Sequence, residues 1–149
     1  MSTYRIQLFA PQTEVAQLDR VCSGLGEDST LPERVLLAWY LRQSDMPKAE
    51  RMAQAMLTAT TGREPHPLGN IRARLLLIQA EIHWLYGRLP QAQELADAAQ
   101  SLFDKAADPI GQADTHYLKA LIHADLGLID QRTVMITAAA GFASRGNDG

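Results

Sequence analysis

Four histidines and one cysteine are the side chains of this chain best suited to bind a metal ion or to act as a nucleophile. His116 and His123 are seven residues apart, which on a helix separates them by roughly 10 Å, too far for one ion. Ligand pairs on a helix normally lie one turn apart with Cys or acidic partners, and His83 has none at such spacing. We predict that His83 and His123 pack in the core, and we expect no metal or other cofactor.

Nucleophilic and acid–base catalysis find no support in the sequence. Cys22 falls in an apolar stripe, which predicts a packed, inert thiol, because activation needs a positive and exposed setting. Glu81 and Asp125 could transfer protons, but no second catalytic group is placed beside either, so both are predicted to be solvated acids on helix faces. The sequence contains no phosphate-binding glycine loop and no nucleophile-elbow motif. The chain is therefore predicted not to be an enzyme.

A repeat of forty residues provides the elements that position these side chains. Shifting the chain by that length aligns His83 with His123 and Gly87 with Gly127. Each copy reads as an apolar-periodic helix ending at glycine, a short turn, and a second, alanine-rich helix. Such hairpins bury their apolar faces only by stacking on neighbours, so the repeat predicts an α-solenoid. Further matched pairs are Ala80 and Ala120, Ile82 and Ile122, and Ala99 and Ala139.

Start and stop signals divide the chain into a tail and one helical domain. The final residues align with the turn that opens a repeat, so we expect the chain to be part of a longer polypeptide. A first helix without a hairpin partner is expected to cap the end of the array. The predicted segments are a tail or short extended segment at residues 1–12, a domain at residues 13–149 with its capping helix near residues 13–25, and hairpins at residues 31–61, 67–106 and 109–145.

Capping residues mark several helix starts. Thr13 is placed to cap the first helix, and Asp45 to cap the second helix of the first hairpin. Thr30 and Glu33 have the spacing of a capping box. Asp108, which precedes a proline, gives the clearest start signal in the chain.

Composition excludes several classes of partner. The chain has 149 residues, of which 46% are hydrophobic and 21% charged, as expected for one globular domain. Its net charge of −3 provides no basic field for a polyanion, so nucleic acid is not an expected partner. The longest apolar run, residues 35–41, is too short to cross a membrane, and no membrane partner is expected. With one cysteine and no signal peptide pattern, the predicted location is cytoplasmic.

The pattern of Ala80, Gly87, Ala92 and Ala99 resembles the tetratricopeptide repeat. Arg132 departs from it, and the period of forty exceeds that family's roughly thirty-four. The longer period, with AEIHWLYG and DPIGQADTHYLKALIHADLG, is similar to variant repeats in large bacterial transcriptional activators and in the amino-terminal input region of GGDEF-type diguanylate cyclases. The resemblance implies an all-α, right-handed α-solenoid of about three antiparallel hairpins. It also implies a non-catalytic sensory or interaction role, as the regulatory arm of a bacterial signalling protein. A freestanding scaffold or adaptor is the alternative.

The first helix of every stacked hairpin is expected to line the concave side. Arginine and aromatic residues dominate binding hot spots, so those outside the packing stripe of these helices form a candidate groove for a protein, a peptide or a second copy of the chain. The alternative is that the aromatic members pack between repeats. The candidate residues are Arg34, Arg42, Arg74, Glu81, Trp84, Tyr117 and Asp125.

Overall fold

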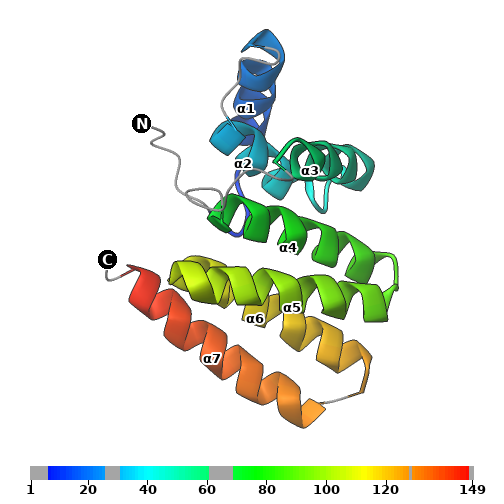
Figure 1. Cartoon of the computed structure of the whole chain (residues 1–149), viewed down its shortest axis with the longest axis vertical. Helices are drawn as coiled ribbons and strands as arrows, with labels where there is room; N and C mark the ends of the chain where they lie inside the picture. The colour runs from blue at the N-terminus through cyan, green and yellow to red at the C-terminus, as the bar shows by residue number, and fades with distance from the viewer. Residues whose placement is uncertain (1–6, 26–30, 61–68, 128, 148–149) are drawn as a thin grey trace.

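The computed structural model describes residues 7–25, 31–60, 69–127 and 129–147. Every regular element within these residues is an α-helix, which confirms the all-α prediction. The described helices, shown in Figure 1, are α1 (Gln12–Leu25), α2 (Leu31–Leu41), α3 (Met46–Thr60), α4 (Gly69–Leu85), α5 (Leu89–Ala106), α6 (Pro109–Asp125) and α7 (Ile129–Asn147).

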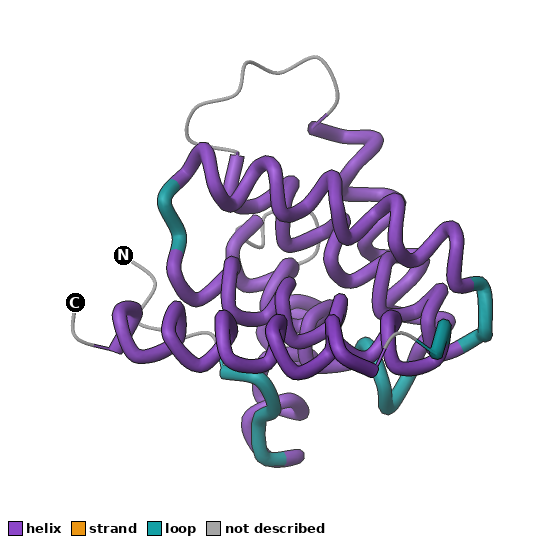
Figure 2. The backbone as a smooth tube through the Cα atoms, turned by 90° about the horizontal axis from the view of Figure 1, so that it is seen from below, coloured by secondary structure: helices purple, strands orange, loops and turns teal. Residues whose placement is uncertain are grey.

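Each helix packs against the next one along the chain, and α4 to α7 follow one another down the molecule in Figure 1. In addition, α2 contacts α4, and α4 contacts α6. The described residues give no equivalent contact between α3 and α5 or between α5 and α7. Figure 2 shows the same helices from below, with the described loops and turns in teal. The helices expected in the three hairpins therefore pack in pairs, as α2 with α3, α4 with α5, and α6 with α7.

Glycines and aspartates end and begin the helices as their chemistry predicts. Gly87 and Gly127 follow α4 and α6 with φ angles of 77° and 81°, which glycine adopts without a steric penalty. Asp45 and Asp108 each accept a hydrogen bond from the backbone amide three residues later, at 3.3 and 3.1 Å. The structure confirms these two turns and two caps.

The start of α1 differs from the prediction. Thr13 was expected to cap this helix, but the helix already begins at Gln12. The carbonyl of Pro11 accepts hydrogen bonds from the backbone amides of Glu14 and Val15 at 3.0 and 3.1 Å. Thr13 is therefore already inside the first turn, where its hydroxyl is not needed as the cap. Thr30, the first half of the predicted capping box, lies outside the described residues.

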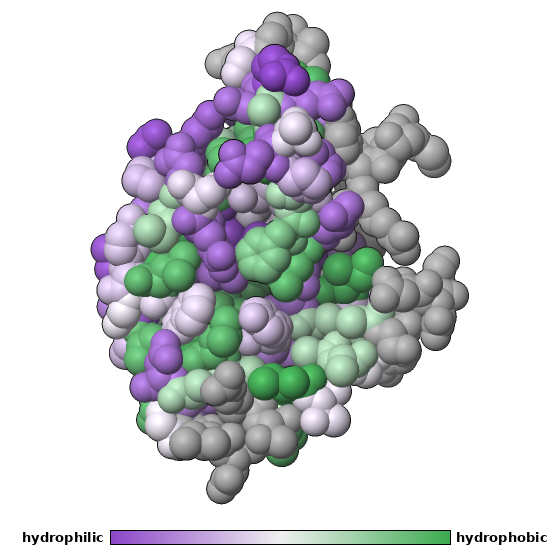
Figure 3. Space-filling view, turned by 180° about the vertical axis from the view of Figure 1, so that it is seen from behind, coloured by the Kyte–Doolittle hydropathy of each residue, from purple (hydrophilic) through white to green (hydrophobic). Residues whose placement is uncertain are grey.

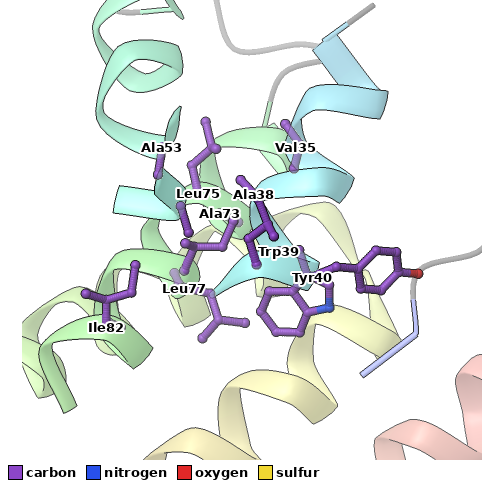
Figure 4. Close-up of a cluster of buried hydrophobic side chains, with 14 of the residues drawn as sticks. Val35, Ala38, Trp39, Tyr40, Ala53, Ala73, Leu75, Leu77 and Ile82 are labelled. Carbon is purple, nitrogen blue, oxygen red and sulfur yellow. The ribbon is translucent and has the colours of Figure 1, made fainter. Parts of the chain in front are cut away.

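Alanines line the contacts between helices in the core. Ala49 and Ala53 of α3 and Ala92, Ala96 and Ala99 of α5 are completely buried. Their small side chains let neighbouring helices approach closely, while larger apolar side chains fill the remaining space. Each fully buried leucine or isoleucine contributes about 1.5–3 kcal/mol relative to exposure. Figure 4 shows the larger residues of α2 and α4, among them Val35, Trp39, Leu75, Leu77 and Ile82.

The segment before α1 lies against α2. The indole nitrogen of Trp39 donates a hydrogen bond to the Gln7 carbonyl at 2.7 Å, and the Arg42 guanidinium donates one to the Leu8 carbonyl at 2.8 Å. The tail predicted for residues 1–12 is therefore, in its described part, a packed segment. The helix α1 that follows packs on α2 and buries Leu18 completely.

Candidate functional site

Three of the seven candidate groove residues are buried. Arg42, Arg74 and Glu81 are only 1%, 2% and 4% exposed, so the prediction that they lie outside the packing stripe is wrong. Glu81 is likewise not the solvated acid that its polar side chain suggested. The physical reason is that α4, which carries Arg74 and Glu81, contacts α2, α3, α5 and α6, while α2, which ends just before Arg42, contacts α1, α3 and α4. Little of either helix therefore faces solvent.

Arg42 is held on several sides. Its Nε forms an ion pair with Oε2 of Glu81, and its Nη1 donates to the Trp39 carbonyl at 2.8 Å. The guanidinium carbon lies 3.6 Å from the centroid of the Trp39 ring and 5.1 Å from that of Phe9. Burial lowers the pKa of Arg42 and raises the pKa of Glu81, while the opposite charge of each partner favours the ionised form of the other. The pair fastens the end of α2 to α4.

Arg74 makes a second buried ion pair, between α4 and α6. Its Nη1 lies 2.6 Å from Oδ2 of Asp114, and its guanidinium carbon is 4.5 Å from the Trp39 ring and 5.1 Å from the Phe103 ring. Asp114 is the residue that the forty-residue offset aligns with Arg74. Opposite charges at equivalent repeat positions are therefore a sequence signal for this contact. Asp114 was missed because the offset was used to match similar residues and not complementary charges.

Trp39 is the other residue that the sequence reading missed. Its ring contacts the guanidinium groups of both Arg42 and Arg74, and the residue is 2% exposed. Cation–aromatic contacts of this kind contribute roughly 0.5–2 kcal/mol, with the larger values in desolvated settings. The segment Leu36 to Leu41 is apolar throughout, so its composition alone predicted packing and gave no sign of an arginine site.

Of the other candidates, Tyr117 and Asp125 lie at the surface, whereas Trp84 packs in part against the hydrophobic core. Tyr117 is 42% exposed, Trp84 is half-buried, and Asp125 is exposed. Nε1 of Trp84 donates a hydrogen bond of 2.6 Å to Oδ2 of Asp125, joining α4 to α6 at the surface. Arg34 is half-buried and lies near Cys22 of α1. On the face shown in Figure 3, hydrophobic and hydrophilic side chains are interspersed.

The three histidines that the structure describes occupy different settings, and His66 lies outside the described residues. His123 is buried, as predicted for a core residue, whereas His83 is half-buried. His116 stacks on the ring of Phe142 in α7, with ring centroids 5.1 Å apart. Burial is the main cause that lowers the pKa of His116, and the positive charge of Lys119 is the second. In the described part of the chain, no group of three His, Cys, Asp or Glu side chains is arranged to hold a metal ion.

Cys22 is a half-buried thiol on α1. Burial raises its pKa, and the lowering influence of Arg34 is smaller. A raised pKa reduces the thiolate fraction at neutral pH, so the site lacks the activation that a nucleophilic cysteine needs.

Two hollows of about 590 Å³ each open on the surface. The first lies between α3 and α4, where its lining includes Arg51, Gln79 and His83. The second lies between the segment before α1, α1 itself and the end of α2, and its lining includes Phe9 and Tyr40. The candidate groove residues Trp84, Tyr117 and Asp125 line neither hollow.

Comparisons with protein-family models, with curated proteins and with solved structures gave no match to this chain. The resemblance to tetratricopeptide repeats and to cyclase input regions accordingly remains a prediction from the sequence. Among the described helices, none combines the length and apolar character needed to cross a bilayer.

Proposed function

We propose that this chain is a protein-interaction module that binds a protein or peptide through the face formed by α2, α4 and α6. The observation that carries the proposal is the surface hydrogen bond of 2.6 Å from Nε1 of half-buried Trp84 on α4 to exposed Asp125 on α6, with exposed Tyr117 eight residues earlier on α6. An aromatic side chain that is already oriented loses little conformational freedom on binding, which favours a hot spot.

The helix contacts support a curved stack with this face on its inner side. The first helices of the pairs touch one another, as α2 with α4 and α4 with α6, whereas in the described residues the second helices α3, α5 and α7 do not. In a curved array of helix pairs, the elements on the inner side approach more closely than those on the outer side. We propose on this ground a tetratricopeptide-like solenoid with α1 at one end.

The resemblance from the sequence extends the proposal to a biological role. We propose a cytoplasmic regulatory arm, without catalytic activity of its own, of a bacterial signalling protein such as a GGDEF-type diguanylate cyclase. A freestanding scaffold or adaptor, or the arm of a large transcriptional activator, is the alternative. The sequence of the full gene distinguishes these roles, since a catalytic or DNA-binding domain in the same polypeptide supports an arm and a stop codon soon after this chain supports an adaptor.

Site-specific photocrosslinking tests the proposed face. A photoreactive amino acid at Tyr117 should capture a partner or a second copy in the native cell, whereas the same amino acid at exposed Glu94 of α5 should not. Asp125→Ala, which releases the indole of Trp84, should weaken capture by about 5- to 30-fold, corresponding to roughly 1–2 kcal/mol for a hot-spot residue. Melting curves must show that the variant is folded. Equal capture from both positions, or none from Tyr117, contradicts the proposal.

A further inference from the structure

The hollow between α3 and α4 carries a charged side chain that the proposed face does not use. The two helices pack side by side (Figure 1), and the hollow between them has a volume of about 590 Å³. Arg51 in its lining is exposed, and among the described residues it forms no ion pair. The lining also includes Pro47 and Ala55, which are both exposed. A guanidinium without a partner beside apolar surface suits a carboxylate that has an apolar neighbour.

The repeat provides a second copy of this interface, between α5 and α6, with which the hollow can be compared. An offset of forty-three residues aligns α3 with α5, and the offset of forty aligns α4 with α6. Gln54 and Gln79 then correspond to Asp97 and Lys119. Nε2 of Gln79 donates to Oε1 of Gln54 at 3.0 Å, and Nζ of Lys119 lies 2.6 Å from Oδ1 of Asp97. The two interfaces are therefore equivalent in structure as well as in sequence.

The two equivalent interfaces differ in charge and in access. Arg51 of α3 corresponds to Glu94 of α5, so one interface presents a cation at the position where the other presents an anion. Both residues are exposed. His83 is half-buried in the lining of the hollow, whereas its counterpart His123 is buried. An acidic ligand is therefore favoured between α3 and α4 and disfavoured between α5 and α6, because opposite charges attract and like charges repel.

His83 gives the hollow a second hydrogen-bond donor. Nη1 of Arg88 lies 3.4 Å from Nδ1 of His83. A guanidinium can only donate, so Nδ1 is the acceptor in this contact and the ring proton is on Nε2. The guanidinium carbon of Arg88 also lies 4.9 Å from the centroid of the Tyr86 ring, which holds Arg88 on a second side. The contact with Arg88 therefore leaves the Nε2–H group of His83 as the donor for a ligand in the hollow.

We propose that this hollow binds an acidic side chain of a partner protein. Arg51 and His83 bind the carboxylate, and an apolar residue next to it in the partner packs on Pro47 and Ala55. A single carboxylate fits better than a phosphate, because Glu50 in the same lining repels a second negative charge. Exposed lining residues would leave a small free acid largely in water, whereas an acidic side chain is held by the rest of the partner. The inference rests on the proposed function in taking a protein or peptide as the ligand, and it adds a contact outside the proposed face.

An NMR titration of the full ¹⁵N-labelled chain with two end-blocked peptides tests the site. The peptides have the sequences ALELA and ALQLA, which differ only in the carboxylate. The glutamate peptide should bind about fivefold more tightly, as expected for one solvent-accessible ion pair, and should shift the imidazole Nε2 signal of His83. Arg51→Gln should remove this preference. The matched control is Arg20→Gln, which changes another exposed arginine that lines neither hollow and should keep the preference.

Several outcomes of this titration overturn the inference. They are equal affinities for the two peptides, failure of the glutamate peptide to bind, and an unchanged preference after Arg51→Gln. Equally tight binding of propionate would make the hollow a site for a free acid and overturns the peptide as its ligand. Both arginines are exposed, so melting curves of the two variants should match that of the unaltered chain. Crosslinking from Tyr117 does not involve the hollow, so the proposed face can stand while the carboxylate site fails.

Discussion

Gly111 of α6 lies directly against the ring of Phe103 in α5, so that a Cβ on this glycine would overlap the ring. Phe103 is completely buried and cannot swing into solvent. The hydroxyl of Thr115 also donates to the Gly111 carbonyl at 2.7 Å. The close approach of α5 and α6 therefore depends on the missing side chain.

Gly111→Ala should destabilise the fold by about 1–3 kcal/mol, because overpacking outweighs the roughly 1 kcal/mol that alanine gains over glycine in a helix. The matched control is Gly141→Ala in α7, where a Cβ meets no neighbouring atom and helix propensity alone should act. Urea denaturation measures both. If Gly111→Ala raises the midpoint as Gly141→Ala does, the two helices are not packed as described.

The turn after α4 requires a left-handed residue. Gly87 has a φ of 77°, and Gly87→Val should cost roughly 1–2 kcal/mol because a Cβ is disfavoured in this region. The reverse change is available at Ala107, which follows α5 with a φ of 52°. Ala107→Gly should relieve that strain and raise the melting temperature. A Gly87→Val protein with an unaltered unfolding midpoint contradicts the turn.

Breaking the ion pair between Arg42 and Glu81 should strongly lower the free energy of unfolding. Glu81→Gln leaves a buried guanidinium without its counter-charge, which typically costs about 3–5 kcal/mol. Asp19→Asn provides the control, because its ion pair with Lys48 is partly exposed to solvent and should contribute less than about 1 kcal/mol. Comparable losses in the two variants, measured by chemical denaturation, would show that the inner pair is solvated.

The imidazole of His116 should make stability depend on pH. Burial, and to a lesser extent the charge of Lys119, keeps the folded-state pKa of His116 below the ordinary value of about 6.5. The charge of Asp104 raises this pKa, but its influence is weaker. Near pH 6.5 the unfolded chain takes up this proton before the folded chain does, so protonation favours unfolding. The contribution of His116 to the free energy of unfolding should fall as the pH drops below about 6.5 and level off once the folded-state pKa is passed. His116→Gln should lessen the loss of stability between pH 7.5 and 5.5, and identical slopes for the two proteins refute this.

The outermost helix α7 should open more readily than α4. Among the described helices it packs only on α6, and Val134 and Ile136 are 69% and 44% exposed. Terminal elements of a stack have one neighbour fewer and open at lower free energy. Amide hydrogen exchange should therefore be faster over residues 134–143 than over residues 75–84. Equal and slow exchange would mean that a second copy or another element covers α7.

The positions of the helices and turns could be read from the sequence, because local chemistry determines them. Gly87 and Gly127 need φ angles that other residues avoid, and Asp45 and Asp108 satisfy amides of their own first turns. Each of these requirements is met within a few residues along the chain. The alternation of helices and their pairing in sequence order followed from them.

Tertiary structure decided which polar residues belong to the core. Helical periodicity placed Arg42, Arg74 and Glu81 outside the apolar stripe of their helices. The spacing of apolar residues identifies one packed face and does not show whether further helices pack against the other faces. Contacts of α4 with α2 and α6 bury these charges, and the acidic partner of each arginine lies far along the chain, at Glu81 and Asp114. The packing of residues 7–10 on α2 could not be predicted from the sequence for the same reason. The carbonyls of Gln7 and Leu8 bond Trp39 and Arg42, and no side-chain pattern shows which donors a backbone carbonyl will meet.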